Sequence, residues 1–139
     1  MGLVYANLEL LNADDLAQAR RNRLPENEVK RLKVRAMVDS GAVMLAINET
    51  VKTQLDLPVL EYRTARLADE STMKLEVVGP VEVRFENRRC LTEAFVLPGN
   101  AEVLLGAVPM ELMDVLIHPA KRQLIVNPEH PNIPQLSMK

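Results

Sequence analysis

The segment Met37-Val38-Asp39-Ser40-Gly41-Ala42-Val43 has an order of residue types that few kinds of site use. An apolar run typical of a buried strand ends in a turn made of an acid, a hydroxyl and a glycine, and apolar residues then resume. Gly41 allows a tight turn and the close approach of other backbone. Asp39 is therefore expected at a strand end among apolar side chains, where a carboxylate needs hydrogen bonds or a shared proton.

A second motif, Val103-Leu104-Leu105-Gly106, lies downstream and is again an apolar run that ends in glycine. The two motifs, in this order and in a chain of 139 residues, resemble the two signatures of the retropepsin-like (retroviral-type) aspartic peptidases. The resemblance runs from about Leu32 to Val126, and it implies that the second run passes behind the catalytic loop and leads into a short helix. Taken alone, Asp39-Ser40-Gly41 also fits an ordinary turn in which Asp39 caps nearby backbone.

The pattern of short alternating segments indicates an all-β barrel or sandwich, because turns recur about every 8 to 12 residues. Strands are expected over 3–11, 31–38, 43–47, 90–97, 115–117 and 123–126, with a long hairpin over 59–85 whose turn is 68–72. Short helices are expected after Asn12, after Asn48 with its end at Pro58, and from Pro109 to Met113. Residues 86–89 are expected to form a turn. The resemblance narrows this class to a closed acid-protease β-barrel with one or two short helices.

The chain is expected to be a single domain over residues 1–139, because its length suits one domain and no repeat is present. By comparison with the family, 12–30 is an insertion, and the proline-bearing segment 128–139 is a tail. The cluster Arg20, Arg21 and Arg23 in that insertion is interpreted as a solvated face. Hydrophobic residues make up 47% of the sequence and aromatic residues only 3%, so aliphatic side chains must fill the core.

Charge and cysteine content limit the partners and the location. The formal net charge of -2 favours neither nucleic acid nor an anionic membrane as a partner. Cys90 is the single cysteine, so no disulfide forms within the chain, and a reducing, cytoplasmic location is expected. We expect no signal peptide and no membrane helix, which would need about 20 apolar residues. His118 and His130 have no companion at ligand spacing, so we expect neither a metal nor another cofactor.

The resemblance implies that two carboxylates share one proton and activate a water for peptide hydrolysis. Only one Asp-Ser-Gly is present, so the second carboxylate must come from another copy, and the expected enzyme is a C2 homodimer that cuts a peptide or protein substrate. The implied catalytic loop is Asp39, Ser40 and Gly41, with Ser40 bonded across to the partner's loop. The implied substrate-binding residues are Ala42, Val43, Leu67, Ala68, Asp69, Glu70 and Val108.

The sequence departs from the family pattern at the lid and beside the motif. The expected flap turn, 68–72, has no glycine, and Val43 and Ala107 are apolar where the family carries an ion pair. Two alternatives therefore stay open. One is a dimeric peptide-binding module with little or no hydrolysis. The other is a different hydrolase that uses the Asp39 turn to bind phosphate or as a nucleophile, although no His or Lys is placed as its base.

Overall fold

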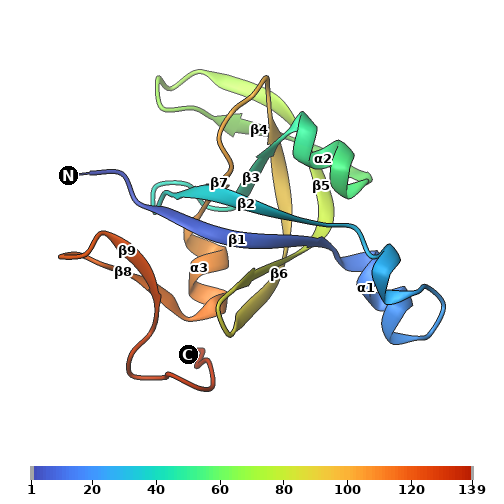
Figure 1. The fold of residues 1–139 in the computed structure, drawn as a ribbon. Coiled ribbons are helices and arrows are strands. Elements are labelled where there is room, and N and C mark those ends of the chain that lie inside the picture. Colours follow the sequence, from blue (N-terminus) through green and yellow to red (C-terminus); the bar gives the residue numbers. More distant parts are fainter. Residues whose placement is uncertain (1, 139) are drawn as a thin grey trace.

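The computed structural model describes residues 2–138, and strands dominate this part of the chain (Figure 1). In chain order the elements are β1 (Tyr5–Asn12), α1 (Ala13–Arg20), the 3-10 turn η1 (Glu26–Glu28), β2 (Arg31–Val38), β3 (Leu45–Asn48), α2 (Glu49–Leu55), β4 (Val59–Arg66), β5 (Thr72–Phe85), β6 (Arg88–Leu97), β7 (Leu104–Leu105), α3 (Ala107–Met113), β8 (Val115–His118) and β9 (Gln123–Val126). No helix among the described residues is both long and apolar enough to cross a membrane.

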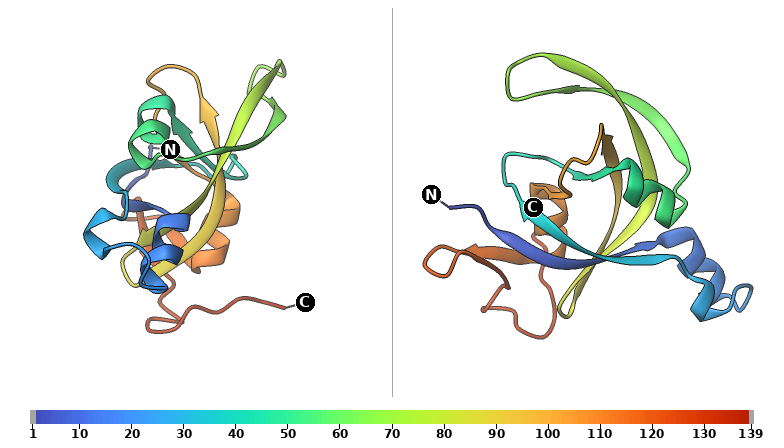
Figure 2. Two further views of the ribbon diagram at one scale, coloured as in Figure 1. Left: turned by 90° about the vertical axis from the view of Figure 1, so that its right-hand side faces the viewer. Right: turned by 45° about the horizontal axis from the view of Figure 1, so that its top comes forward.

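One large sheet carries most of the strands and bends into a ring-like arrangement (Figure 2). Within residues 2–138 its order is β1-β2-β7-β3-β6-β5-β4, and β5 pairs with β1 as well. This extra pairing joins β1, at one end of that order, to a strand near the other end. β8 and β9 form a separate two-stranded sheet. The prediction of a mainly β fold is confirmed.

The core is built from aliphatic side chains that alternate along the strands. In β1, Ala6, Leu8 and Leu10 are buried, while the residues between them are exposed or half-buried. Leu45 and Leu105, from β3 and β7, are completely buried beside them in the same core. Each buried leucine contributes about 2 kcal/mol through its removal from water. A period of two along each strand therefore sets which face points inward.

The long strand β5 changes partner halfway along its length. Its first part pairs with β4 as far as Val78, and its second part pairs with β1 from Val81 onward. The register against β6 also shifts between these two residues. Pro80 has no N–H to give to a strand ladder, which explains why the pairing is interrupted here. The predicted hairpin over 59–85 is therefore right for residues 59–78 and wrong for the second part of β5.

Three predicted boundaries are wrong for identifiable physical reasons. The strand expected from Val43 begins only at Leu45, because the carbonyls of Ala42 and Val43 accept the amides at the start of α3. Helix α2 ends before Asp56, which adopts a left-handed conformation (φ 50), and not at Pro58. The turn expected over 86–89 is shorter, since Arg88 already belongs to β6 and is buried.

Residues 13–30 connect β1 to β2 and carry Leu16 and Val29, which form a small separate core with Leu11 of β1. Asn12 caps α1 as expected, because its side-chain oxygen accepts the amide of Asp15 at 3.0 Å. The same side chain donates to the carbonyl of Leu55 at 2.9 Å. This buried asparagine therefore joins the start of α1 to the end of α2.

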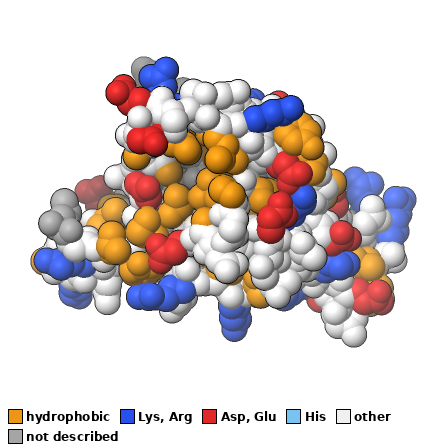
Figure 3. Space-filling model, turned by 90° about the horizontal axis from the view of Figure 1, so that it is seen from above, with side chains coloured by type: hydrophobic (Ala, Val, Ile, Leu, Met, Phe, Trp, Pro, Cys, Tyr) orange, Lys and Arg blue, Asp and Glu red, His pale blue; other side chains and the backbone are white. Residues whose placement is uncertain are grey.

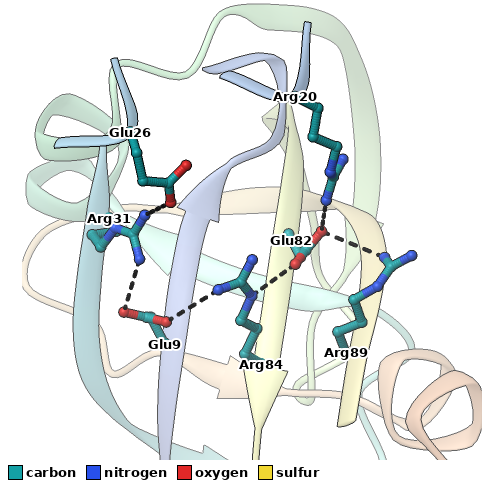
Figure 4. A network of polar contacts seen from close by, with 7 residues as sticks. All are labelled: Glu9, Arg20, Glu26, Arg31, Glu82, Arg84 and Arg89. Atoms are coloured by element: carbon teal, nitrogen blue, oxygen red, sulfur yellow. Dashed lines mark hydrogen bonds and ion pairs between the residues drawn. The ribbon is translucent and has the colours of Figure 1, made fainter. Parts of the chain in front are cut away.

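A polar network covers the outer side of β1, β5 and β6 and reaches α1 (Figure 4). At its centre is Glu82, whose side chain is only 2% exposed. Its carboxylate pairs with Arg84 at 2.8 Å and with Arg20 and Arg89 at 3.4 Å. Burial of a carboxylate is costly unless it has such partners. Arg20 is 59% exposed, as a solvated face requires, and it also links α1 to the sheet.

Gly106 lies where two loops come closest to each other. A Cβ at this position would meet the carbonyl oxygen of Met44 and would lie 2.8 Å from the carbonyl oxygen of Ala42. Both contacts are with backbone, which cannot move aside as the end of a side chain can. The second glycine of the sequence pattern is therefore required by space at this crossing.

We expect Gly106→Ala to lower the free energy of unfolding by roughly 3 kcal/mol, the upper end of the usual cost of overpacking. Urea denaturation of the full chain measures this loss. Gly99→Ala is the matched control, because Gly99 has φ 68 but nothing within 4 Å, so only backbone strain of about 1 kcal/mol is expected there. Equal losses in the two variants would contradict the proposed crowding at Gly106.

Candidate active site

The Asp39 loop is fixed by the short strand β7. Val38, the last residue of β2, is paired in parallel with Leu105, and the amide of Asp39 donates to the carbonyl of Leu105 at 3.0 Å. On its other side β7 pairs with β3, where Ala46 is opposite Leu104. The second apolar run of the sequence therefore lies directly behind the Asp39 loop.

The start of α3 fixes the other side of the same loop. The amides of Ala107 and Val108 donate to the carbonyls of Ala42 and Val43 at 2.8 and 2.9 Å. These are helix N-terminal amides, which have no partner within the helix and must find acceptors elsewhere. The loop is thus held between β7 and α3 by backbone bonds alone, and this arrangement needs no ion pair between positions 43 and 107.

The Asp39 side chain is half-buried at the point where β2 ends. Its Oδ1 accepts the amide of Gly41 at 2.9 Å, and its carbonyl accepts the amide of Ala42 at 3.1 Å. A Cβ on residue 41 would lie 3.2 Å from Oδ1, so glycine suits this tight turn. Among the described residues Gly41 is the one donor to the carboxylate, which leaves Oδ2 open to solvent chemistry or to a second carboxyl group.

Asp39 stands at the edge of a largely apolar cleft of about 810 Å³. Figure 3 shows hydrophobic side chains gathered around a hollow on this side of the molecule. The cleft is lined by Asp39, Gly41, Ala42, Val43, Met44, Ala46, Ala65, Arg66, Leu67, Ala68, Leu75, Phe95, Leu97 and Leu104. Asp39 is the one carboxylate among them, and no His or Lys lines this space. The alternative hydrolase therefore lacks a base here as well.

The turn between β4 and β5 forms one wall of the cleft through Leu67 and Ala68. The amide of Leu67 donates to Ser71 at 2.8 Å, and the amide of Glu70 donates to Leu67 at 3.0 Å. Glu70 has φ 67, a left-handed conformation that glycine adopts most easily. Most turns of this kind have glycine at such a position. The side chain of Glu70 makes the left-handed conformation energetically costly.

Not every predicted contact residue lines the cleft in the single chain. Ala42, Val43, Leu67 and Ala68 do, whereas Asp69, Glu70 and Val108 do not. The Asp69 carboxylate accepts both the hydroxyl and the amide of Ser71, and the hydroxyl is the main reason why the pKa of Asp69 lies below its usual value. The prediction that these last three residues touch substrate remains a prediction.

Ser40 is exposed and sits beside Gly41 at the outer surface of the loop. Among residues 2–138 no partner is found for its hydroxyl, and it does not line the cleft. Its expected bond to the loop of a second copy therefore remains a prediction. A hydroxyl must be exposed to reach a second copy of the chain, and the hydroxyl of Ser40 lies in an exposed residue.

The floor of the cleft was missed at the sequence level. Phe95 and Leu97 of β6 lie on the strand face opposite Ala94 and Val96, which are buried in the core. Ala46 pairs with Phe95 and brings β3 into the same floor. The alternation along 90–97 could have indicated this floor. Ala94 and Val96 lie on the face that packs in the core, so the larger Phe95 and Leu97 lie on the opposite face.

Other groups with possible chemistry lie elsewhere. No set of three His, Cys, Asp or Glu side chains among the described residues is arranged to hold a metal ion. His118 accepts the amide of Lys121 through Nδ1 at 3.1 Å, within its own turn. His130 lies 2.7 Å from Asp114, in the segment that follows β9. Neither histidine lines the cleft that contains Asp39.

Neither a comparison with models of protein families nor a search of curated proteins finds a match to this chain. The Asp39 loop, the cleft and the turn beside it are the features of this chain that bear on its function.

We expect the Cys90 thiol to be inert in the folded protein. The side chain is buried, and burial raises the pKa of the thiol to about 11, so almost no thiolate exists at pH 8. A colorimetric thiol reagent should react slowly with the native chain and quickly, with one equivalent, after denaturation in urea. Rapid reaction of the native protein would contradict the burial of this side chain.

Proposed function

We propose that this chain is one half of an aspartic endopeptidase of the retropepsin-like type, in which Asp39 of two copies forms the catalytic pair. The observation that carries the proposal is that Asp39 is the one carboxylate lining an apolar cleft. One carboxylate cannot both activate a water and protonate a leaving group at the same moment. A second carboxylate is therefore required, and a second copy of the same loop supplies it.

Symmetry gives the simplest source of that second group. In a C2 dimer the same surface of both subunits meets at the axis, so a residue on the axis faces its own copy. Ser40 and Gly41 are exposed, and Val43 and Val108 beside them are 65% and 43% exposed. Apolar side chains left in water next to the loop favour a surface that becomes covered.

In the proposed reaction, a water lies between the two Asp39 carboxyl groups, of which one is protonated. The ionised carboxylate removes a proton from the water as its oxygen attacks the carbonyl carbon of the peptide bond. The protonated carboxyl donates its proton toward the substrate, and the leaving nitrogen departs as an amine after it has gained a proton. Two carboxylates at close range hold one proton between them, because the second ionisation is opposed by the first charge.

The cleft sets the kind of peptide that fits. Its walls are Ala42, Val43, Leu67 and Ala68, and its floor includes Phe95, so apolar side chains next to the cut bond gain most from burial. The turn over 67–71 is proposed to close over the bound peptide. Closure of a lid removes surplus water and adds contacts to the substrate.

The proposal extends to the closure of the sheet, the oligomeric state and the location of the protein. The ring-like sheet is proposed to be the closed barrel of this peptidase type, and the dimer to be its working form. A cytoplasmic location is proposed from the single, buried cysteine, which suits a reducing compartment.

A dimeric peptide-binding module with little hydrolysis is the second candidate. It is favoured by Glu70, which holds the lid turn in a left-handed conformation without glycine. A stiff lid can bind an extended peptide and still open slowly. The two candidates differ in whether the peptide bond is cut, so a cleavage assay separates them.

We expect Asp39→Asn to abolish cleavage of a peptide library, since an amide cannot share a proton as a carboxyl group does. Asp56→Asn is the matched control, because Asp56 lies at the end of α2 and tolerates asparagine in its left-handed conformation. Both variants should sediment at twice the mass of one chain. Full activity in Asp39→Asn, or its loss with a chelator in the wild type, would contradict the mechanism.

Mixing wild type with Asp39→Asn sharpens this test. Suppose that each active site needs Asp39 from two chains. In an equal mixture at exchange equilibrium, about a quarter of all dimers then contain two wild-type chains. Activity should then fall to about a quarter of that of wild type at the same total concentration. A site complete within one chain would keep half, and that result would reject the shared pair.

We expect Glu70→Gly to change turnover or KM for peptide substrates, because it frees the lid turn to adopt its left-handed conformation without strain. Glu86→Gly is the matched control, since Glu86 also has a positive φ (51) but lies in the β5–β6 turn, outside the cleft. Both changes should alter the thermal midpoint only slightly. Identical kinetic constants in Glu70→Gly and wild type would show that this turn does not gate the cleft.

A further inference from the structure

Asp114 is the point at which the segment after β9 is attached to the body of the protein. It follows α3 directly and adopts a left-handed conformation (φ 55). Its Oδ1 accepts the side-chain amide of Asn127 at 3.0 Å, and its Oδ2 accepts the backbone amide of Gln135 at 2.9 Å. The imidazole Nδ1 of His130 lies 2.7 Å from the same Oδ2. One carboxylate therefore holds three residues of a segment that has no regular secondary structure.

Arg88 supports this attachment from the opposite side. Its side chain is completely buried, it donates to the carbonyl of His130, and its Nη2 lies 4.0 Å from Oδ2 of Asp114. Its Nε and Nη1 have no partner among the described residues. A buried guanidinium needs a nearby negative charge, and Asp114 supplies the one found here. Neighbouring Asn87 adds a bond to the carbonyl of Pro131 at 3.0 Å.

The charged groups around Asp114 are few. Arg88 comes from β6 and His130 from the segment itself, while Glu111 of α3 lines the same hollow as Asp114. His118 of β8 is bonded within its own turn, and β9 has no titratable side chain. Asp114 is thus the carboxylate that lies between the Arg88 guanidinium and the His130 imidazole.

We propose that residues 127–135 form a strap that stays attached only while Asp114 is ionised, so that acid releases it from the folded body. When the carboxyl group takes up a proton it loses its charge, so it accepts the hydrogen bonds of the strap amides more weakly. The guanidinium of Arg88 is then buried without a negative charge nearby, which favours release. This inference is independent of the proposed peptidase function.

The pH at which release occurs follows from the direction of the pKa shift. The backbone amide of Gln135 is the main reason why the pKa of Asp114 lies below its usual value, with the side chains of Asn127 and His130 adding to it. A lowered folded-state pKa means that the attachment is fully present above the ordinary carboxyl pKa. It is lost as the pH falls through the lower, folded value.

Release has a consequence for the helix that reaches the candidate site. Asn127 and Gln135 of the strap line a hollow of about 540 Å³ beside α3 and β8, together with Met110 and Ile117. α3 begins at Ala107, whose amide holds the Asp39 loop, and ends at Asp114. A released strap would therefore uncover apolar surface at the far end of the helix that supports this loop.

The experiment places a fluorophore on Met138→Cys in the full chain and follows its anisotropy from pH 7 to pH 2.5. Met138 is 87% exposed, and the buried Cys90 does not compete for the label. The fluorophore is one whose emission is constant over this range. Near-ultraviolet circular dichroism of the same samples reports whether the folded body persists. Anisotropy should fall in one step while the body remains folded.

Gln135→Pro removes the main amide donor to Asp114 at an exposed position, and Gln135→Ala keeps it, which makes a matched pair. Release should move to higher pH in Gln135→Pro and stay at the wild-type pH in Gln135→Ala. Asp114→Asn, if it folds, should show a released strap at pH 7. The proposal is overturned if the strap and the body lose order together, if the strap stays attached to pH 2.5, or if both Gln135 variants release at the same pH.

Discussion

The close approach of two backbone segments at Gly106 is the constraint on which the rest of the structure depends. The loop after β2 and the start of α3 meet where a side chain would collide with the backbone of Met44. At that distance helix amides reach the carbonyls of Ala42 and Val43 directly. The Asp39 loop is therefore held by main-chain geometry, and the side chains beside it are free to line the cleft. An apolar Val43 and Ala107 are compatible with this arrangement, because no buried charge is left unpaired.

Defined hydrogen bonds hold the Asp39 loop, whereas most side chains that line the cleft are apolar. Asp39 is fixed by the carbonyl of Leu105 and by the amide of Gly41, whereas the walls are small or aliphatic side chains. Asp39 and Arg66 are the two charged residues among those that line the cleft. In the proposed dimer a second carboxylate lies beside the first, and two like charges at close range oppose each other's ionisation. This is why the oligomeric state and the chemistry are linked in the proposed function.

Glu82, Arg88 and Asp114 do not line the cleft, and they act as attachments between segments of the chain. Glu82 joins α1 to the sheet through Arg20, Arg84 and Arg89, as Figure 4 shows. Arg88 and Asp114 join the last segment to the end of α3. In both places a charge removed from water is matched by an opposite charge or by backbone groups, as burial demands. Segments that contribute little to the main core are thereby held against it.

Local patterns along the chain were enough to predict most helices and strands and the position of the Asp39 turn. Alternation fixed the strands, and Asn12 and Asn48 fixed two helix starts, where their side chains accept the amides of Asp15 and Val51. These features depend on neighbours within a few residues, so a linear pattern contains them. Three other features become visible only in three dimensions. The pairing of β5 changes from β4 to β1, Phe95 forms the floor of the cleft, and Arg88 is buried beside Asp114. Each of these joins residues far apart in the chain, and their pairing is set by packing and charge balance, which no local pattern records.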